Sequence, residues 1–190
     1  MPVPIGLRDF HYALLTDDVI DPAPNADYVA PVRLIGAVTA NINPNPASET
    51  FFADDGPMDT ASTLGQIELE LSVADIPLAT LATLLGHDAP VAGRMYRKAD
   101  AVAPWVAVGF RSLKSDGTYR FTWLLKGKFQ EPEQNNETKG DAINYQPPTI
   151  TGQFVKRDAD DAWILQGDEE DVTFVPGTWF DVATLTALAP

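Results

Sequence analysis

The sequence predicts a mainly β domain whose sheet is covered by one or two short helices. Alternating apolar and polar residues mark several strands, and 13 glycines and 16 prolines favour turns between short elements over a helix bundle. A length of 190 residues suits one domain, and a hydrophobic content of 45% suffices for a packed core. We therefore expect a single domain over residues 1–190, with arms or loops at 1–8, 44–62 and 131–148.

The most distinct element is a β-hairpin over residues 104–130. Its turn is Ser115-Asp116-Gly117, because Asp and Gly tolerate the positive φ of tight hairpins. In the second strand the apolar side chains are Tyr119, Phe121, Trp123, Leu125 and Phe129, and the polar ones are Thr118, Arg120, Thr122, Lys126 and Lys128. This alternation predicts one buried and one wet face, and only Leu124 interrupts it.

A second clear strand covers residues 65–73, where Glu68 and Glu70 share the polar face. A helix over 75–86 is expected to follow, with Asp75 as its N-cap and Gly86 as its stop. Its apolar stripe, which should pack on the sheet, consists of Leu78, Leu81, Ala82 and Leu85.

The remaining elements are predicted from shorter patterns. Strands are expected at 9–16, 32–42, 49–54, 149–157 and 162–167. A last helix is expected over 178–188, with Thr178 as its cap and Asp181 returning the hydrogen bond. Residues 22–31 are proline-rich and predict a joint, whereas the polar stretch 131–148 predicts a long loop.

The charge pattern restricts the possible partners. The net charge of −14 disfavours a nucleic-acid binder, because binding to phosphates requires cations. The charge is uneven: residues 94–128 hold eight basic and two acidic side chains, whereas 158–171 hold seven acidic and no basic ones. Both segments could be solvated faces. Alternatively, a basic surface could meet an acidic surface on a second copy of the chain.

Catalytic constellations are not recognisable in the sequence. The two histidines, His11 and His87, accompany no nucleophile motif, and a chain without cysteine cannot form thiolate metal sites. The sequence "GKF" at 127–129 lacks the glycine and the Ser/Thr of a phosphate-binding loop. Adjacent acids such as Glu169 and Glu170 fall in polar segments, without the apolar pocket that acid catalysis requires. We expect no enzyme activity, no metal and no cofactor.

The stretch "ADDGPMD" at 53–59 concentrates three carboxylates: Asp54, Asp55 and Asp59. A calcium loop of the EF-hand type needs acids at alternate positions and flanking helices, and neither condition is met here. We interpret the stretch as a turn that interrupts strands, with a calcium role as the less favoured alternative.

Membrane segments and secretory signals are not expected. The start "MPVPIGLRDF" lacks the basic and apolar regions of a signal peptide. The longest uncharged apolar stretch, 76–87, is too short to span a bilayer. We expect a protein that is made in a cytoplasm and does not associate with membranes.

Several blocks of the chain together resemble one known family. They include "IGLRDFHYALLTDD" at 5–18, "APVRLIGAVTANINPNPASETFFADDGPMDTASTLGQIELELSVADIPL" at 30–78, "LLGH" at 84–87 and "APWVAVGFRSLKSDGTYRFTWLLKGKFQEPEQNNETKGDAINYQPPTITGQFVKRD" at 103–158. In this order they resemble the major tail protein, or tail tube protein, of long-tailed bacteriophages and prophages. The least similar segments are 19–29, 88–102 and the end of the chain after about residue 160.

The resemblance implies a β-sandwich or barrel flanked by an α-helix, with long loops or arms. It also implies hexameric rings that stack into a hollow tube, through which the DNA genome passes during ejection without specific binding. The implied partners are further copies of the chain, a tape-measure protein, and tail terminator and initiator proteins. The implied location is the virion tail, assembled in the cytoplasm of the host bacterium.

Particular residues receive expected roles on this basis. Glu68 and Glu70 are lumen candidates because they form the clearest acidic strand face. The residues expected at contacts between subunits are Asp54, Asp55, Asp59, Arg120, Lys126, Lys128, Glu131 and Glu133. The alternative is a small β-sandwich module that decorates a virion and binds carbohydrate or protein. Such modules display surface aromatics, whereas Trp105, Trp123, Trp163 and Trp179 fall in patterns typical of a core.

Overall fold

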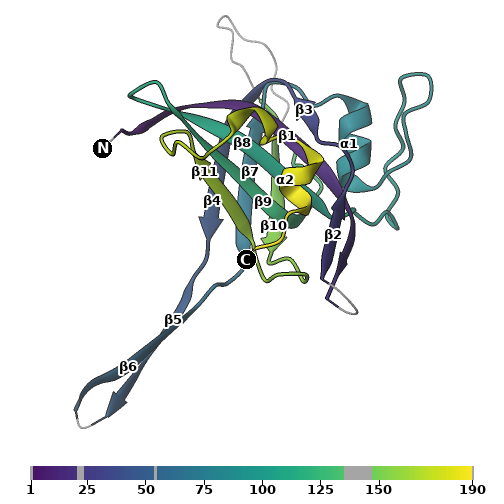
Figure 1. The fold of residues 1–190 in the computed structure, drawn as a ribbon. Helices are drawn as coiled ribbons and strands as arrows, with labels where there is room; N and C mark the ends of the chain where they lie inside the picture. The colour runs from purple at the N-terminus through teal and green to yellow at the C-terminus, as the bar shows by residue number, and fades with distance from the viewer. Residues whose placement is uncertain (1, 21–23, 54, 135–146, 190) are drawn as a thin grey trace, which may run out of the picture.

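The computed structural model describes residues 2–20, 24–53, 55–134 and 147–189, and it is mainly β as the sequence predicts (Figure 1). A large antiparallel sheet has the strand order β2-β1-β8-β9-β10-β7-β4, with β3 paired to β1 and β11 paired to β9. Strands β5 and β6 form a separate two-stranded hairpin.

The elements follow one another along the chain with these bounds. The strands are β1 (Pro4–Val19), β2 (Asn25–Tyr28), β3 (Val32–Leu34), β4 (Ala37–Pro44), β5 (Ala47–Ala53), β6 (Gly56–Thr63), β7 (Ile67–Val73), β8 (Val106–Lys114), β9 (Tyr119–Phe129), β10 (Thr149–Val155) and β11 (Ile164–Asp168). The helices are α1 (Leu78–Leu85), the 3₁₀ turn η1 (Pro176–Thr178) and α2 (Val182–Thr186).

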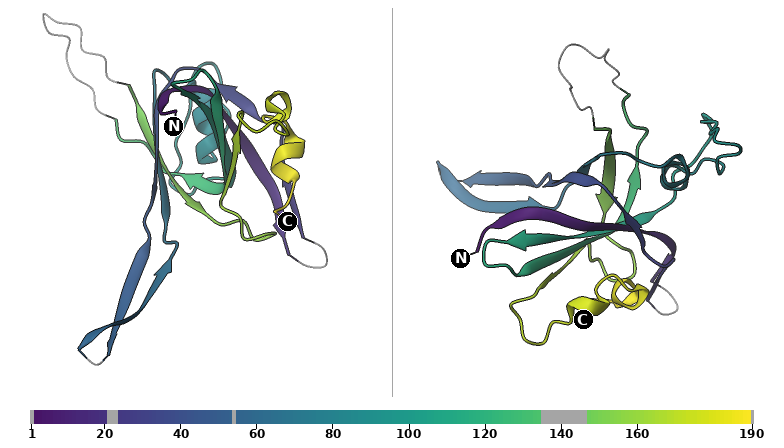
Figure 2. Two further views of the ribbon diagram at one scale, coloured as in Figure 1. Left: turned by 60° about the vertical axis from the view of Figure 1, so that its left-hand side comes forward. Right: turned by 90° about the horizontal axis from the view of Figure 1, so that it is seen from above.

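Strand β9 organises the sheet because it pairs with three other strands. It pairs with β8 from Tyr119 to Gly127, while its opposite edge pairs first with β11 and then with β10. The register between β8 and β9 shifts between Val106 and Val108, which marks a bulge. The sheet curls, so that β4 and β7 lie across from β1 and β8 (Figure 2).

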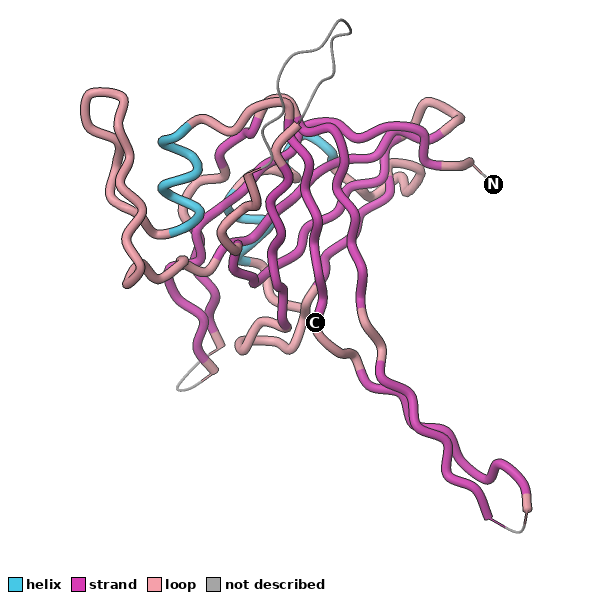
Figure 3. Tube along the Cα trace, turned by 180° about the vertical axis from the view of Figure 1, so that it is seen from behind, coloured by secondary structure: helices cyan, strands magenta, loops and turns pink. Residues whose placement is uncertain are grey.

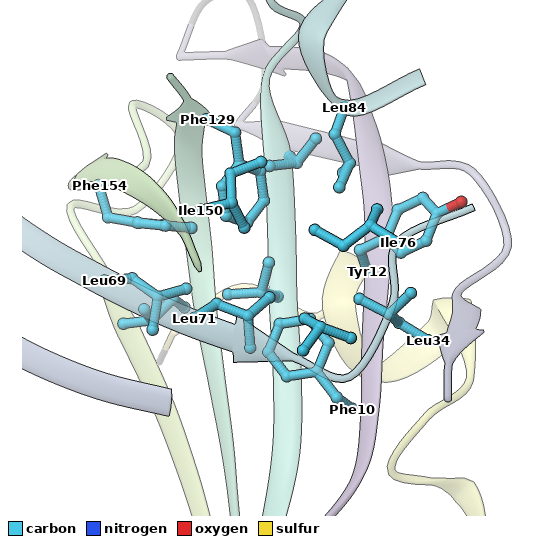
Figure 4. Packing of buried hydrophobic residues seen from close by; sticks show 14 of the residues in the cluster. Phe10, Tyr12, Leu34, Leu69, Leu71, Ile76, Leu84, Phe129, Ile150 and Phe154 are labelled. Atoms are coloured by element: carbon cyan, nitrogen blue, oxygen red, sulfur yellow. The ribbon is translucent and has the colours of Figure 1, made fainter. Parts of the chain in front are cut away.

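The first core fills the space inside this curl. Leu69 and Leu71 of β7 face Phe10 of β1 across it, and helix α1 contributes Leu84 at one side (Figure 4). The buried α1 residues are Leu81, Ala82, Leu84 and Leu85, so Leu84 takes the place expected for Leu78, which is exposed. Gly86 ends the helix in the left-handed conformation, with φ 74° and ψ 26°, as predicted.

The second core lies on the other face of β8 and β9. The C-terminal segment covers this face (Figure 2), and its residues Trp179 and Leu185 belong to this core. The ring of Trp179 lies 5.7 Å from that of Phe121, and Trp123 donates its indole N–H to the Trp179 carbonyl over 3.0 Å. Aromatic packing and one buried hydrogen bond therefore attach the end of the chain to the sheet.

Two cores leave β9 without the wet face that its sequence pattern predicts. Phe121, Trp123 and Leu125 point into the second core, and Leu124 points into the first. Thr122 and Lys126, expected in water, are buried. The prediction was wrong because both faces of β9 are covered. The C-terminal segment covers the side of Phe121 and Trp123, and Thr122 lies on the other side, opposite Phe110 of the first core. Alternation cannot reveal cover on the second side.

The end of the chain does not form one helix over 178–188. It divides into η1 and α2, separated by Trp179, and Asp181 rather than Thr178 occupies the N-cap position of α2 without a side-chain capping bond. The buried Trp179 ring and its carbonyl, which accepts the Trp123 bond, hold the backbone at the point where a continuous helix would have to pass.

Four further boundaries differ from the sequence predictions. Residues 4–8 are not an arm but the start of β1, because they pair with β8. The proline-rich segment 22–31 contains β2, and the strand predicted at 32–42 is split into β3 and β4 by Gly36, whose φ is 93°. Asp59 belongs to β6 rather than to a turn.

The arm expected at 44–62 is the β5–β6 hairpin, which projects away from the body of the molecule (Figures 1 and 3). Its strands pair from Ala47 with Thr63 to Ala53 with Gly56. The loop expected at 131–148 has no regular structure at 131–134 and 147–148, and its residues 135–146 lie outside the described part.

A substitution at Gly109 of β8 tests the packing of the second core. A Cβ atom there would lie 2.4 Å from the Trp123 ring, which is fully buried and cannot move aside. We expect Gly109→Ala to lower the free energy of unfolding by about 1–3 kcal/mol, as overpacked core substitutions do.

The matched control is Gly177→Ala, because no atom lies within 4 Å of the added Cβ and its φ is not in the left-handed region. Its effect should stay within about 0.5 kcal/mol. Urea unfolding monitored by tryptophan fluorescence measures both. Equal stability of the two variants would contradict the packing described here.

Candidate interaction surfaces

The outer side of the β4–β7–β10 layer is mostly polar, and the exposed Val155 at the end of β10 is the exception. Glu70 of β7 lies opposite Asn41 of β4 and Thr151 of β10 in the sheet register. Residues paired in this way point to the same side of a sheet. The polar sheet face defined by these pairs consists of Thr39, Asn41, Asn43, Glu68, Glu70, Ser72, Thr149, Thr151 and Gln153. All of them are exposed or half-buried, while the other side of each strand packs into the first core.

The charged members of the polar sheet face are Glu68, which is half-buried, and Glu70, which is exposed. Ser72 and Thr149 join β7 to β10 through a hydroxyl–hydroxyl bond of 2.8 Å. Lys128 lies at the border of this face, opposite Gln153. Its amino group stands 4.5 Å from the centroid of the Trp105 ring, a cation–π arrangement. The face is therefore neutral to acidic, with one cation at its margin.

Trp105 is not a core residue, contrary to the prediction, because 38% of its surface is exposed. It immediately precedes β8, and the ammonium groups of both Lys126 and Lys128 lie within 5.0 Å of its ring centroid. Trp123 and Trp179 are buried and Trp163 is half-buried, as predicted for core tryptophans. Trp105 lines none of the three grooves of the described surface that border β1, β10 and β11.

A polar groove of about 670 Å³ brings three predicted residues together: Glu70, Glu131 and Glu133. Glu131 is held by two basic groups. Its Oε1 lies 2.5 Å from His87 Nε2, and its Oε2 accepts a bond of 3.1 Å from Arg97. The imidazole of His87 is buried below this carboxylate, and its Nδ1 finds no protein partner among the described residues.

The β5–β6 arm carries acidic side chains in an exposed position. Glu49 lies on β5 and Asp59 on β6, and both are exposed. Asp55, at the tip, has a left-handed backbone with φ 62° and is exposed as well. Asp54 lies outside the described residues. The tip is thus a turn, as predicted, although the strands extend closer to it than expected.

The acidic segment 158–171 finds basic partners within the same chain. Lys114, whose side chain is only 2% exposed, binds Asp168 and donates a bond of 2.9 Å to Glu170. Arg120 donates bonds of 3.1 and 2.7 Å to one oxygen of Asp168. Burial disfavours the charged form of Lys114, but its bonds with these carboxylates raise its pKa overall.

Lys126 has a similar role beside β1. Its amino group lies 2.6 Å from Asp18 and 2.7 Å from Asp158, and the side chain is 8% exposed. Burial opposes ionisation of Asp18, yet bonds from the Asp158 and Ala159 amides and from Lys126 lower its pKa. Arg120 and Lys126 thus meet their acids within one chain, where contact with a second copy was expected. We therefore assign neither residue to a contact between copies of the chain.

Arg157 and Asp160 form a buried pair that the sequence did not single out. The Arg157 guanidinium binds Asp160 and donates a bond of 2.6 Å to the carbonyl of Leu185 in α2. Asp160 also accepts a bond of 2.7 Å from the Ala189 amide. This pair fixes the C-terminal segment. The sequence contains one signal for this pair, because Arg157 directly precedes the acidic segment 158–171.

Strand β4 forms one edge of the large sheet. It pairs with β7 on one side, and within the described ranges no strand pairs with its other side between Thr39 and Pro44. Val38 beside this stretch is 53% exposed. An exposed edge of this kind offers free N–H and C=O groups to another strand.

The described residues do not form a metal-binding cluster. Within residues 2–20, 24–53, 55–134 and 147–189, no three His, Asp or Glu side chains cluster as metal ligands would. His11 stacks on Phe180 at 4.1 Å, and its Nδ1 lies 2.8 Å from the Asp9 carbonyl. Burial lowers the pKa of His11. These contacts describe a packed side chain.

No helix in the described part of the chain combines the length and the apolar character needed to cross a bilayer.

The fold and surfaces define a mainly β protein with an antiparallel sheet, a polar sheet face and a projecting arm. A scan against protein-family models finds no match, and a search among curated proteins finds none either.

The ion pairs of Asp168 make the free energy of unfolding depend on pH in the acidic range. Its bonds from Lys114 and Arg120 lower its pKa from 3.8 to about 2. A carboxyl with a depressed folded-state pKa stabilises the fold above its unfolded pKa, and this contribution disappears as pH falls. Asp168→Asn should therefore lower the free energy of unfolding at pH 7, and its difference from wild type should shrink between about pH 4 and 2.

The measurement is urea unfolding of both proteins at pH 7, 4, 3 and 2. Asp161→Asn is the control, because its pair with Lys156 is exposed on both sides and should contribute little. A difference between Asp168→Asn and wild type that stays constant down to pH 2 would show that these ion pairs do not stabilise the fold.

Proposed function

We propose that this protein is the major tail tube subunit of a long-tailed bacteriophage or prophage. Its copies close into hexameric rings that stack into a hollow tube, and the DNA genome passes through this tube during ejection. The observation that carries the proposal is the polar sheet face of β4, β7 and β10, which is acidic and borders the open edge of β4.

The composition of the polar sheet face suits the wall of a wide, water-filled channel. Its Thr, Asn, Gln and Ser side chains are hydrated and uncharged, and Glu68 and Glu70 add negative charge. DNA is attracted by cations and repelled by carboxylates. A wall of this composition lets DNA slide. Lys128, the cation at its margin, is held against Trp105.

The open edge of β4 supports ring formation. Unpaired strand edges are a hazard for aggregation, and closure with other strands removes them. If a neighbouring copy pairs with β4, the polar sheet face continues from one subunit to the next. Closed rotational symmetry then limits the number of copies and produces an annulus.

The β5–β6 arm supports contacts between rings. A two-stranded hairpin alone is marginally stable in water, and this one projects away from the sheet (Figure 3). An arm of this kind gains stability when another surface receives it. Its acids Glu49, Asp55 and Asp59 are available for basic partners on a neighbouring subunit.

A tail tube subunit has further partners under this proposal. A tape-measure protein occupies the bore during assembly, and terminator and initiator proteins contact the two ends of the tube. Assembly takes place in the host cytoplasm, and the finished protein is part of the virion. The role needs neither catalysis nor a cofactor. A decoration module is supported less well, since Trp105 is a single exposed tryptophan away from the three grooves.

The direct test is negative-stain electron microscopy of the concentrated purified chain. We expect rings and tubes with a stain-filled central channel, because ring closure buries the β4 edges. Analytical ultracentrifugation of the same samples should show species much larger than a monomer. Monomers only, at every concentration and also with tail initiator complexes present, would contradict the proposal.

Glu70→Lys tests the charge of the bore. Glu70 is an exposed member of the polar sheet face, so each hexameric ring would gain positive charge in its lumen. We expect assembled variant tubes to retain short duplex DNA in a filter-binding assay at low salt, whereas wild-type tubes do not. The control is Asp75→Lys, an equal charge change at an exposed residue outside this face. DNA retention by the control to the same extent would mean that Glu70 is not in the lumen.

A further inference from the structure

A groove of about 330 Å³ gathers three arginines around one carboxylate. Arg8, Arg33 and Arg111 line it, together with Asp9 and the turn between β3 and β4. We call it the arginine groove. In a chain with a net charge of −14, a surface with three cations and one anion is an exception.

The backbone places Asp9 at the centre of the arginine groove. The register between β1 and β8 shifts between Arg8 and His11, and Asp9 has a φ of 51°. A left-handed residue inside a strand turns its side chain away from the regular alternation. The Asp9 carboxylate binds both Arg33 and Arg111, one with each oxygen. Asp9 thereby neutralises one positive charge of the three.

The remaining basic groups are only partly satisfied. The Arg111 guanidinium lies 4.3 Å from the centroid of the Tyr119 ring, and its buried Nε has no protein partner among the described residues. Arg8 reaches the Tyr119 hydroxyl only at 3.5 Å. Arg33 keeps 58% of its side chain exposed. The groove therefore offers exposed guanidinium N–H donors with a preference for carboxylates.

The arginine groove and the acidic arm lie at opposite ends of the same strand. The groove is bordered by Ile35, Gly36 and Ala37, where β4 begins, whereas the arm follows Pro44, where β4 ends. An eight-residue strand separates the two by roughly 25 Å. The arm projects away from the sheet beyond the end of β4 (Figures 1 and 3). The arm of a chain cannot reach the groove of the same chain.

We propose that the arginine groove receives the acidic β5–β6 arm of a second copy of this chain. The two surfaces are complementary in charge, because residues 45–64 carry Glu49, Asp54, Asp55 and Asp59 and no basic residue. This inference rests on the proposed tube function and specifies which surface the arm contacts. The Asp55 carboxylate at the tip is the group that Arg33 and Arg8 bind.

The geometry of this contact determines the kind of assembly. Two different surfaces meet, one at each end of β4, so the contact is heterologous. Repetition of a heterologous contact gives a ring where the rotation closes and an open stack where it does not, and the proposed tube uses the open stack. Each ring extends its arms to the grooves of the next ring. Because the contact is formed by exposed charges, added salt weakens it.

Disulfide trapping tests the contact directly, since the chain contains no cysteine. The variant carries Arg33→Cys and Asp55→Cys together, one in the groove and one on the arm. After oxidation of assembled samples, a non-reducing gel should show a ladder of covalently linked chains. The matched control combines Asp55→Cys with Arg94→Cys, because Arg94 is exposed but does not line the groove. The control should remain monomeric on the gel.

Charge exchange provides a second test. Arg33→Glu and Asp55→Arg should each cause loss of stacked rings in electron micrographs, because like charges then meet. The combined variant should recover the stacks. If Arg33→Glu fails to fold, as judged by its thermal melt, the disulfide ladder decides.

The outcomes separate this inference from the function on which it rests. Wild-type tubes without a ladder from the groove–arm pair, or with a ladder of equal yield from the control, overturn the arginine groove as the receptor and leave the tube function intact. A wild-type protein that never assembles overturns both. A ladder from the groove–arm pair alone supports both.

Discussion

The burial of β9 on both faces is the constraint on which the rest of the structure depends. One side closes the first core with β7 and helix α1, and the other side closes the second core with the C-terminal segment. Substitutions in β9 therefore affect two cores at once. The β4–β7–β10 layer differs, because within the described residues nothing covers its outer side, and the residues on that side are mostly hydrophilic.

The acidic excess of the chain serves two purposes that the structure separates. Some acids are internal anchors: Asp18, Asp160 and Asp168 bind buried or half-buried basic groups and hold the C-terminal half in place. Others remain exposed, among them Glu49, Asp55 and Asp59 on the β5–β6 arm and Glu70 on the polar sheet face. The anchors are part of the folded chain, whereas the exposed acids are available for neighbours and for repulsion of DNA.

The sequence predicted those elements whose signal is local. The hairpin of β8 and β9, strand β7 and the Gly86 helix stop follow from alternation and from turn chemistry, and all three are confirmed. Strand β2 was missed because its pairing with β1 is not apparent in a proline-rich segment.

The wrong predictions share one physical cause. Segments distant in the sequence pack over an element, and the local sequence pattern does not show this packing. Cover on both faces of β9 makes Thr122 and Lys126 internal, and Trp179 interrupts the last helix. At the candidate surfaces, Glu68 and Glu70 were recognised from strand parity. The arginine groove was not recognised, because a bulge and three distant strands bring Arg8, Arg33 and Arg111 together.

A tube function requires that the polar sheet face point toward the central channel of the assembly. A cryo-electron microscopy map of assembled wild-type protein, at a resolution that shows strands, measures this directly. We expect β4, β7 and β10 to surround the central channel, with Glu68 and Glu70 directed at the axis. A map that places this layer on the outer surface, or shows a channel lined by arginine and lysine side chains, would contradict the account.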